Sequence, residues 1–383
     1  MFFTTTVSAA DYYVNPAGAD TNPGSTVAPF KNIQKAVDLA MPGDTVHLQD
    51  GIYLQDVISK RNGQSTLPIT ITGSKSAFVL GAGAARIVEI NHDYIVLDGF
   101  TIDGNWGADT NSASAYRDKL IYIIGKDVRE GVTGLKLQNM TIQNAGGECV
   151  RLRYFSHDNE IAHNIISTCG IVDFRFNGGG KNGEGIYVGT APEQRGQNGA
   201  PTTDPDITQN NWIHDNIINT QGNECVDIKE DATKNIVERN DCTGQKDPES
   251  GGFDSRGNAN VFRNNKVSAS VGAGVRLGGD TALYGINNDV YNNEITNSQT
   301  GGIKFQGQPQ GIICGNIMSG NVGGDAVGTY KAQFNPTAPC TTSPVPSDTP
   351  VITGAACRLG DANHDGNISL ADYSVWRQIF MRQ

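Results

Sequence analysis

The chain has 383 residues, enough for one large domain or two ordinary ones with a substantial buried core. Its 37% hydrophobic content excludes general disorder, and no apolar run approaches the ~20 residues that a membrane helix needs. A net charge of −11 argues against a chain built to bind nucleic acid non-specifically. The 47 glycines are about 12% of the chain, above the usual ~7%, and indicate many turns.

The start of the chain has two features. Residues 1–10 combine an apolar stretch with small residues, like the trimmed end of a secretory signal, although the basic residues that open such a signal are missing. We expect a signal-peptide remnant and a secreted protein; a disordered tail is the alternative. Residues 29–40 then carry apolar side chains at helical spacing, and we expect a helix that covers exposed strand edges. This stretch resembles the N-terminal cap of secreted β-helix carbohydrate enzymes.

Two kinds of short block alternate along the middle of the chain. One has the form apolar-x-x-Asn-x-apolar, and its Asn residues recur 52, 24, 25, 28 and 23 positions apart, so that one coil takes about 25 residues and the 52 is interpreted as two coils. Phe100 and Met140 take the Asn position in two earlier blocks. The Asn residues, which we expect to form an interior ladder at a turn, are Asn164, Asn216, Asn240, Asn265, Asn293 and Asn316.

The other block alternates apolar and polar positions, as in a short strand with one face inward. Strands of this length cannot bury themselves singly but can stack as a parallel solenoid. The sequence therefore predicts an all-β fold, a right-handed parallel β-helix, over residues 11–335. Seven cysteines without a CxxC pair fit an oxidising setting, with Cys149/Cys169 and Cys225/Cys242 as plausible pairs and at least one thiol left over.

Stacked coils lie about 4.8 Å apart, so equivalent positions of these strands form columns of side chains on one outer face. Like charges in such columns repel each other unless a counter-ion is bound, and carboxylates are the ligands that Ca²⁺ prefers. We predict calcium ligands and cations for an anionic substrate here; a ladder of mutually neutralising salt bridges is the alternative. The predicted body ligands are Glu184, Glu224, Asp227 and Asp254, and the predicted substrate-binding cations are Arg151, Arg153, Arg276 and Lys304.

The segment from Glu224 to Lys229, followed by residues 235–240 and 255–264, resembles the active-site strands of polysaccharide lyase family six, the chondroitinase B and alginate lyase group. The resemblance implies that Glu224 binds calcium, that Lys229 is the Brønsted base, and that Arg256 is the acid or the partner of the substrate carboxylate. Residues that depart from the pattern of that family are Glu230, Asp231 and Gly257.

The β-helix also resembles polysaccharide lyase family nine, pectate lyases with an Asp-rich calcium site and a Lys base, which Asp227 and Asp254 suit. Either resemblance implies a Ca²⁺-dependent lyase that cleaves a uronic-acid polysaccharide, of pectate or alginate type, by β-elimination. The weakly acidic C5 proton requires charge stabilisation before a base removes it. A Lys base needs a lowered pKa, which we expect Arg153 and Arg256 to provide for Lys229.

Two other functions remain open from the sequence. Asp227 and Asp254 as paired carboxylates would suit glycoside hydrolysis, although the motifs of β-helix polygalacturonases are absent as a set. A non-catalytic carbohydrate-binding protein would need aromatic platforms, and aromatic residues are only 7% of the chain; Trp106 and Trp212 are the candidates, with packing as the simpler interpretation.

The C-terminal segment differs in composition. Five prolines among Thr, Ser and Ala predict a linker over residues 336–356. Residues 357–383 contain a Ca²⁺ loop of EF-hand type, with Gly366 at its turn and the predicted ligands Asp361, Asn363, Asp365, Asn367, Ser369 and Asp372. This segment resembles one of the two repeats of a dockerin, which implies a cohesin partner and attachment to a cell surface or cellulosome. We expect a monomer that binds neither nucleic acid nor membrane.

Overall fold

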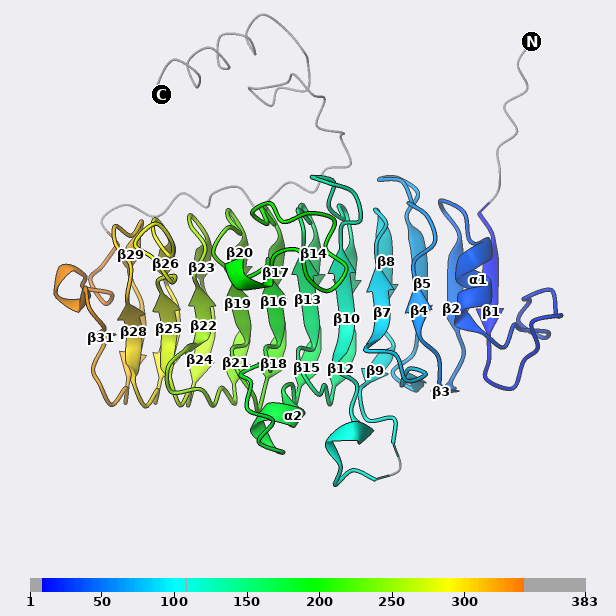
Figure 1. Cartoon of the computed structure of the whole chain (residues 1–383), viewed down its shortest axis with the longest axis horizontal. Coiled ribbons are helices and arrows are strands. Elements are labelled where there is room, and N and C mark those ends of the chain that lie inside the picture. The colour runs from blue at the N-terminus through cyan, green and yellow to red at the C-terminus, as the bar shows by residue number, and fades with distance from the viewer. Residues whose placement is uncertain (1–8, 108, 341–383) are drawn as a thin grey trace, which may run out of the picture. The chain divides into compact units, whose positions relative to one another are not determined.

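The computed structural model describes residues 9–107 and 109–340, and within them the chain winds as a right-handed parallel β-helix (Figure 1). The stack runs from β1 at the N-terminal end to β31 at the other, and its strands form three parallel sheets. The predicted all-β parallel β-helix is therefore confirmed. No helix in this part of the chain is long and apolar enough to cross a membrane.

Sheet A has 11 strands, in the order β1 (Asp11–Val14), β2 (Thr45–Leu48), β5 (Ile69–Gly73), β8 (Ile95–Asp98), β11 (Lys136–Gln138), β14 (Glu160–Ala162), β17 (Trp212–His214), β20 (Ile236–Glu238), β23 (Val261–Arg263), β26 (Asp289–Tyr291) and β29 (Ile313–Cys314). Sheet B has 10 strands: β3 (Gly51–Tyr53), β6 (Ala77–Val79), β9 (Thr101–Asp103), β12 (Thr141–Gln143), β15 (Ile165–Ser167), β18 (Ile217–Asn219), β21 (Asp241–Thr243), β24 (Lys266–Ser268), β27 (Glu294–Thr296) and β30 (Ile317–Ser319).

Sheet C, which carries the candidate site, also has 10 strands. From the N-terminal end they are β4 (Val57–Ile58), β7 (Arg86–Ile90), β10 (Lys119–Ile124), β13 (Val150–Arg153), β16 (Ile186–Val188), β19 (Val226–Ile228), β22 (Gly251–Ser255), β25 (Ala273–Leu277), β28 (Gly301–Phe305) and β31 (Ala326–Val327). The short helical segments are α1 (Ile33–Leu39), η1 (Ala113–Ala115), α2 (Ile171–Phe174), η2 (Pro192–Gln194) and η3 (Lys331–Gln333).

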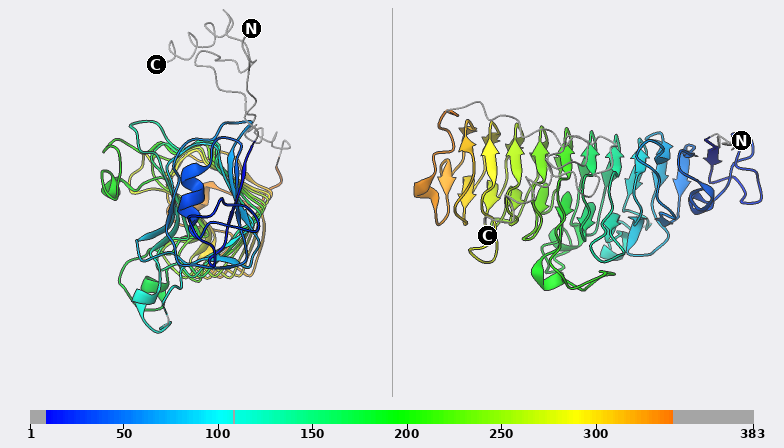
Figure 2. Two further views of the ribbon diagram at one scale, coloured as in Figure 1. Left: turned by 90° about the vertical axis from the view of Figure 1, so that its right-hand side faces the viewer. Right: turned by 90° about the horizontal axis from the view of Figure 1, so that it is seen from above.

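The core consists of apolar side chains stacked coil on coil. On sheet B the inward residues stand in register, and the buried ladder formed in this way comprises Ile142, Ile166, Ile218, Cys242, Val267 and Ile295. Such stacking removes apolar surface from water in every coil, which is the main stabilising contribution. Helix α1 lies at the N-terminal end of the stack (Figure 2) and buries Ile33, Ala36 and Val37 in the same core. Its role as an end cap stays a prediction.

The predicted Asn ladder is present at the turn between sheets A and B. The Asn164 backbone N–H and side-chain Nδ2 both donate to Asn216 Oδ1, at 3.0 and 2.9 Å, and the pattern repeats to Asn316. A second ladder that we did not predict runs five positions earlier in each coil. It comprises Asn159, Asn211, Asn235, Asn260 and Asn288.

One interpretation of the repeat was wrong. The 52 residues between Asn164 and Asn216 form one coil, because Ile161 on β14 pairs directly with Ile213 on β17. The additional length lies in two insertions, residues 168–185 with α2 and residues 190–208 with η2. Residue spacing alone could not separate a long coil from two short ones, since insertions between strands leave the strand register unchanged.

Covalent links and the end of the β-helix also follow from the structure. The expected disulfides Cys149–Cys169 and Cys225–Cys242 are present, together with Cys314–Cys340, which we did not predict. Residues 336–340, assigned above to the linker, belong to the β-helix unit, because Gly315 N–H donates to Ala338 O and Cys340 is bonded to Cys314. The rest of the predicted linker, the calcium loop of residues 361–372 and residues 1–8 lie outside the described residues.

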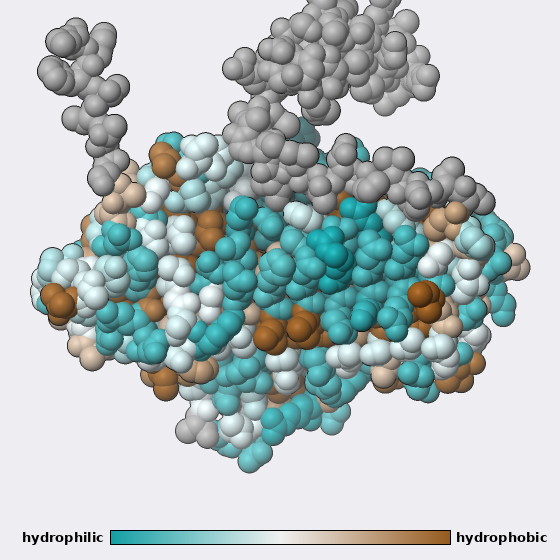
Figure 3. Space-filling view, turned by 180° about the vertical axis from the view of Figure 1, so that it is seen from behind, coloured by the Kyte–Doolittle hydropathy of each residue, from teal (hydrophilic) through white to brown (hydrophobic). Residues whose placement is uncertain are grey.

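The surface of the unit is strongly polar where Figure 3 shows it: hydrophilic side chains form a broad field across the middle of that face, and hydrophobic residues appear singly or in small groups.

Candidate active site

A cavity of about 490 Å³ opens on the outer face of sheet C, and polar and charged side chains line most of it. Tyr187 on β16, Arg276 on β25 and Lys304 on β28 line it from the strands, and its other lining residues come from the loops before and after the strands of sheet C. The predicted site residues that line it are Glu184, Glu224, Lys229, Arg256, Arg276 and Lys304.

The predicted column of outward residues stands in register across five pairs of strands. Arg151 pairs with Tyr187, which pairs with Asp227, followed by Asp254, Arg276 and Lys304. Parallel pairing places these side chains one above the other at the coil spacing. The sequence columns therefore predicted which residues share this face.

Three carboxylates converge at one edge of the cavity. One oxygen each of Glu184, Glu224 and Asp227 lies within 4.8 Å of the others, and all three side chains are buried. Glu224 and Glu184 precede strands of neighbouring coils, which the hydrogen bond from Gly185 N–H to Glu224 O (2.8 Å) joins. The Cys225–Cys242 disulfide adjoins Glu224 and fixes this turn.

The three carboxylates lack enough cationic partners. Glu224 accepts a hydrogen bond from Ser250 Oγ, but Glu224 Oε2 and Asp227 Oδ1 are buried with no hydrogen-bond partner among the described residues. Burial, together with the charges of Glu148 and Asp227, raises the pKa of Glu184 to about 7. Burial and the charges of Asp227 and Glu184 likewise hold the pKa of Glu224 well above its ordinary value. The fold therefore holds negative charge in a place that disfavours it.

Asp254 lies apart from the three-carboxylate cluster. Its two oxygens accept hydrogen bonds from Arg276 Nη1 at 3.0 and 2.9 Å, and Ser250 Oγ lies 3.2 Å from Oδ2. Asp227 and Asp254 are both buried beneath the cavity rather than lining it. The structure thus brings together three of the four predicted body ligands and joins the fourth to a cation.

Lys229 lies at the centre of the site. Its ammonium Nζ is 2.5 Å from Asp227 Oδ2 and 4.7 Å from the centre of the Tyr187 ring. Burial alone would lower the pKa of Lys229, but the Asp227 carboxylate holds it well above its ordinary value. Our expectation that Arg153 and Arg256 lower this pKa was wrong. Arg256 does oppose protonation, but its effect is smaller than that of Asp227, which is in direct contact.

Arg256 is held above the cavity floor by acids on two sides. Its Nη1 donates to Asp280 at 2.8 Å and lies 3.5 Å from Glu230 Oε1, while its Nε is buried without a hydrogen-bond partner among the described residues. Lys304 Nζ donates to Glu249 O at 2.9 Å, and Lys181, which is not among the predicted site residues, pairs with Asp247 at 2.9 Å on the rim. These groups give the cavity a cationic rim over an acidic edge.

Arg151 and Arg153 do not line the cavity. Arg151 Nη1 is bonded to Glu148 at 2.9 Å, its guanidinium lies 4.2 Å from the centre of the Tyr187 ring, and Gln194 accepts a bond from Nη2. The fully buried Arg153 donates to Tyr122 Oη at 2.8 Å and to Thr190 Oγ1 at 3.0 Å. Both lie beneath the loop of residues 190–208. The spacing of residues in the sequence could not predict that this loop covers them.

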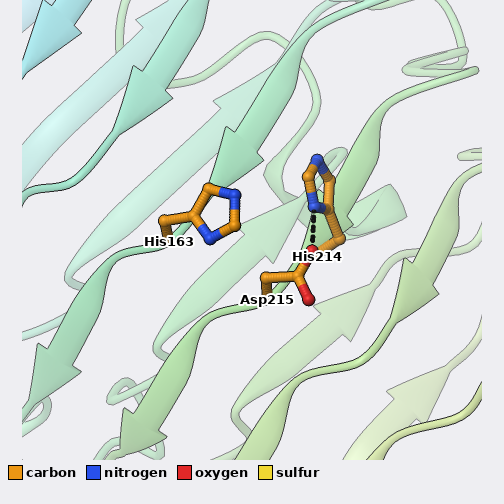
Figure 4. A group of neighbouring side chains, drawn as sticks. All are labelled: His163, His214 and Asp215. Atoms are coloured by element: carbon orange, nitrogen blue, oxygen red, sulfur yellow. Dashed lines mark hydrogen bonds and ion pairs between the residues drawn. The ribbon is translucent and has the colours of Figure 1, made fainter.

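A second cluster of potential metal ligands lies on the opposite side of the coils, at sheet A. His163, His214 and Asp215 have ligand atoms within 4.8 Å of one another, and Figure 4 shows His214 bonded to Asp215. His214 Nδ1 is 2.6 Å from Asp215, and its Nε2 is 3.2 Å from Glu160 Oε1. Because both ring nitrogens already contact carboxylates, we interpret His214 as a structural group.

Trp212 belongs to the same packing arrangement. Its ring stacks on His214 with centroids 3.6 Å apart, and its Nε1 donates to Glu238 Oε1 at 2.8 Å. Trp106 is partly exposed and lies 5.6 Å from the Arg117 guanidinium. Neither ring lines the cavity.

These features define a parallel β-helix protein with an acidic, cation-rimmed cavity on one sheet. The sequence model of a family described as "Protein of unknown function (DUF1565)" matches residues 16–269, and the chain belongs to that family.

Two curated proteins share short segments with this chain. Pectate lyase PEL9 of Emericella nidulans is 40% identical over 86 residues, 22% of this chain and 19% of that protein. The uncharacterized protein YwoF of Bacillus subtilis is 33% identical over 76 residues, 20% of this chain and 16% of that protein. The matched segment spans less than a fifth of the length of either relative.

Solved structures are similar over most of the chain. An alginate lyase from Paenibacillus sp. str. FPU-7 has a TM-score of 0.61 at 19% identity, over 83% of this chain and 99% of that one. The pectate lyase Pel9A has a TM-score of 0.53 at 13% identity, over 88% and 83%. The GH136 lacto-N-biosidase from Eubacterium ramulus has a TM-score of 0.54 at 13% identity, over 84% and 67%. At these identities the similarity establishes the β-helix fold.

Proposed function

We propose that this protein is a Ca²⁺-dependent polysaccharide lyase that cleaves a uronic-acid polysaccharide, of pectate or alginate type, by β-elimination. The observation that carries the proposal is the cavity itself, in which Lys229 and Arg256 lie beside a cluster of three carboxylates with unpaired oxygens. Similarity in fold to a pectate lyase and an alginate lyase supports it.

The donor set fits calcium. Ca²⁺ binds carboxylate and carbonyl oxygens, and Glu184, Glu224 and Asp227 offer carboxylates within 4.8 Å of one another. The buried, unpartnered oxygens of Glu224 and Asp227 are the atoms that a cation would satisfy, and Asn223 Oδ1 is a third such oxygen in the cavity wall. When bound, Ca²⁺ would supply positive charge beside the substrate carboxylate.

Lys229 is the proposed base, and it removes the C5 proton of the uronic acid. The ion pair with Asp227 keeps its ammonium protonated, so the base is competent only in a state in which this pair is weakened. Tyr187, which lies under the ammonium, limits the positions that the amine can take.

Arg256 is the proposed partner of the substrate carboxylate, since it lines the cavity and its Nε makes no hydrogen bond among the described residues, with Asp254 Oδ2 3.8 Å away. A guanidinium suits this role because it binds a carboxylate through two parallel hydrogen bonds. Arg276, Lys304 and Lys181 on the cavity surface would bind neighbouring acidic sugars. Arg151 and Arg153 would act indirectly, by holding Tyr187 and the loop above them.

A panel of polyuronates and neutral polysaccharides, assayed with and without EDTA, tests the activity. On one polyuronate we expect an unsaturated product detected by ultraviolet absorbance, and Lys229→Ala should abolish it because the proposed base is removed. The exposed Lys246 provides a matched control, and Lys246→Ala should retain activity. A folded Lys229→Ala protein with unchanged turnover removes Lys229 from the mechanism.

Calcium binding has a separate test in thermal unfolding. Adding Ca²⁺ at about 100 times its dissociation constant should stabilise the native protein by about 2.7 kcal/mol, through mass action on the folded state. Glu224→Gln should lose most of this shift, whereas Glu249→Gln, at a side chain that is 78% exposed, should keep it. An equal shift in both variants contradicts a site at Glu224.

Glycoside hydrolysis is the second candidate function. Glu184 lines the cavity, and its carboxyl group has a pKa raised to about 7, which suits a general acid. Asp227 and Asp254 suit the reaction less well, since each is bonded to a cation and neither lines the cavity. Reducing sugar released without an unsaturated product would favour this function.

Secretion and attachment belong to the same proposal. Three disulfides are typical of an oxidising, extracellular environment. The dockerin-like segment of residues 357–383, which contains the predicted calcium loop of residues 361–372, would bind a cohesin partner. Retention of the full chain, and not of a chain ending at residue 340, on immobilised cohesin would support this role.

A further inference from the structure

The loop of residues 190–208 covers the outer face of sheet C on the N-terminal side of the cavity. Asp206 anchors it from within: its carboxylate accepts hydrogen bonds from Tyr154 N–H at 2.7 Å and Phe155 N–H at 2.9 Å, and also from Thr190 and Thr208. Asp206 and both hydroxyls are buried. The loop is therefore held at its start and at its end by one buried carboxylate.

The middle of the loop reaches across three coils toward the N-terminal end. Gly196 N–H donates to Tyr154 Oη at 2.8 Å, Ala200 packs on a cluster that includes Tyr122 on β10, and Arg86 on β7 donates to Asn198 O at 2.7 Å. The outward side chains of β10 and β13 are consequently buried under it, and Tyr122 is 0% exposed. Substrate cannot lie on these coils while the loop is in place.

The cavity extends only in the other direction. Among the described residues, those that line it on the strands begin with Tyr187 on β16 and continue to Lys304 on β28, and Glu193 and Gln194 of the loop form its N-terminal wall. The coil of Lys229 and Glu224 is one step from β16, and neighbouring coils are about 4.8 Å apart. Between the proposed base and the wall there is therefore space for little more than one sugar ring.

We infer that the cavity binds the end of a polysaccharide chain, with Gln194 and Tyr187 contacting the terminal sugar unit and the rest of the chain running toward Lys304. The inference rests on the proposed function and adds the mode of attack. An enzyme with this wall releases short products from chain ends, because an internal segment would need space on both sides of the proposed base.

The first test uses the native protein on polygalacturonate and alginate of several chain lengths at equal mass. We expect the rate to rise in proportion to the number of chain ends, and we expect short oligosaccharides to be released from the first time points while the viscosity hardly falls. A rate that is independent of chain length, with a steep early fall in viscosity, overturns the inference.

The second test opens the wall. Gly196 lies against Thr203, so residues 197–202 can be replaced by two glycines, and Glu193→Ala with Gln194→Ala clears the cavity side. In this variant the loss of viscosity per bond broken should rise several-fold, whereas Lys246→Ala, at an exposed residue that does not line the cavity, should not change it. A folded variant with the native ratio overturns the role of the loop, and the native chain-length experiment decides the inference if the variant does not fold.

Failure of the proposed chemistry would be visible separately. If the native protein cleaves neither polymer, Lys229→Ala is titrated with polygalacturonate and alginate of two lengths at equal mass. Binding sites that scale with the number of chain ends support the inference. Binding that scales with polymer mass, or no binding to either polymer, overturns it.

Discussion

The Asn ladder and the three-carboxylate cluster of Glu184, Glu224 and Asp227 are products of the same coil repeat, yet their energetics are opposite. In the ladder, Asn216 accepts two hydrogen bonds from Asn164 and in turn donates to Asn240, so each amide satisfies its neighbour. In the three-carboxylate cluster, one oxygen each of Glu184, Glu224 and Asp227 lies within 4.8 Å of the others, but these groups accept few bonds, and Glu224 and Asp227 each keep an unpaired buried oxygen.

The difference shows which groups stabilise the coils of a solenoid and which are suited to bind a ligand. A neutral group that is both donor and acceptor can repeat along the stack without a net electrostatic cost, so it recurs in coil after coil. A carboxylate is only an acceptor, and repetition brings like charges together. The acidic cluster therefore costs stability unless a cation or a substrate group completes it, which marks it as the functional part of the repeat.

The largest effect is expected when the ladder is broken. Asn240→Ala removes the acceptor that Asn216 N–H and Nδ2 share and the donor to Ile213 O, so buried polar groups of the preceding coil lose their partners and the link to Asn265 weakens; we expect a loss of about 3 kcal/mol in the free energy of unfolding. Urea unfolding measures this change. The exposed Asn219 on β18 gives the control, and Asn219→Ala should cost less than about 0.5 kcal/mol. Equal losses would mean that the ladder contributes no more than a surface amide.

A smaller change in the free energy of unfolding, of opposite sign, is expected when the charge of the three-carboxylate cluster is reduced. Because the folded-state pKa of Glu184 is raised from 4.5 to about 7, its contribution to stability is complete below 4.5 and is lost as the pH rises through 7, to an extent on the order of 3 kcal/mol at most. In EDTA at pH 8, Glu184→Gln should therefore be more stable than the native protein, and at pH 4 the two should be similar. Thermal unfolding across this range gives the comparison.

The exposed Glu193 is the matched control for that experiment, since Glu193→Gln changes the same chemical group at the rim of the cavity. It should leave the pH dependence of the melting temperature unchanged. If Glu184→Gln and the native protein lose stability in parallel between pH 4 and 8, the destabilisation does not come from ionisation of Glu184.

The repeat made the fold and the outward column predictable, because register follows directly from aligned blocks. The pairing of Asp227 with Asp254 and of Arg276 with Lys304 across neighbouring strands was predicted in this way. The second ladder also had a sequence signal that we did not use, an Asn five positions before each of the first five Asn residues of the first ladder. Local periodicity is sufficient for such features because each contact joins equivalent positions of adjacent coils.

What the repeat could not predict lies in the insertions. Gln194 contacts Arg151 from a loop that belongs to no coil position, and Asn198 is 112 residues away from its partner Arg86. The ionisation of Lys229 also depended on which neighbour it contacts, Asp227 rather than Arg153. Such contacts are set by the path of a loop and by side-chain rotamers, and neither has a period.

The smallest effect is expected on the outer face of sheet A, where Lys136 on β11 and Glu160 on β14 form an ion pair across neighbouring strands. Lys136 Nζ lies 3.0 Å from Glu160 Oε2, with 44% of the lysine side chain exposed, so solvent screens most of the attraction. Lys136→Ala should cost about 0.5 kcal/mol in urea unfolding at low salt and less at high salt. The exposed Lys60 serves as the control, and Lys60→Ala should show a smaller dependence on salt. A loss comparable to that of Asn240→Ala would contradict the expected order of these effects, because paired surface charges would then stabilise the coils as strongly as the buried amides do.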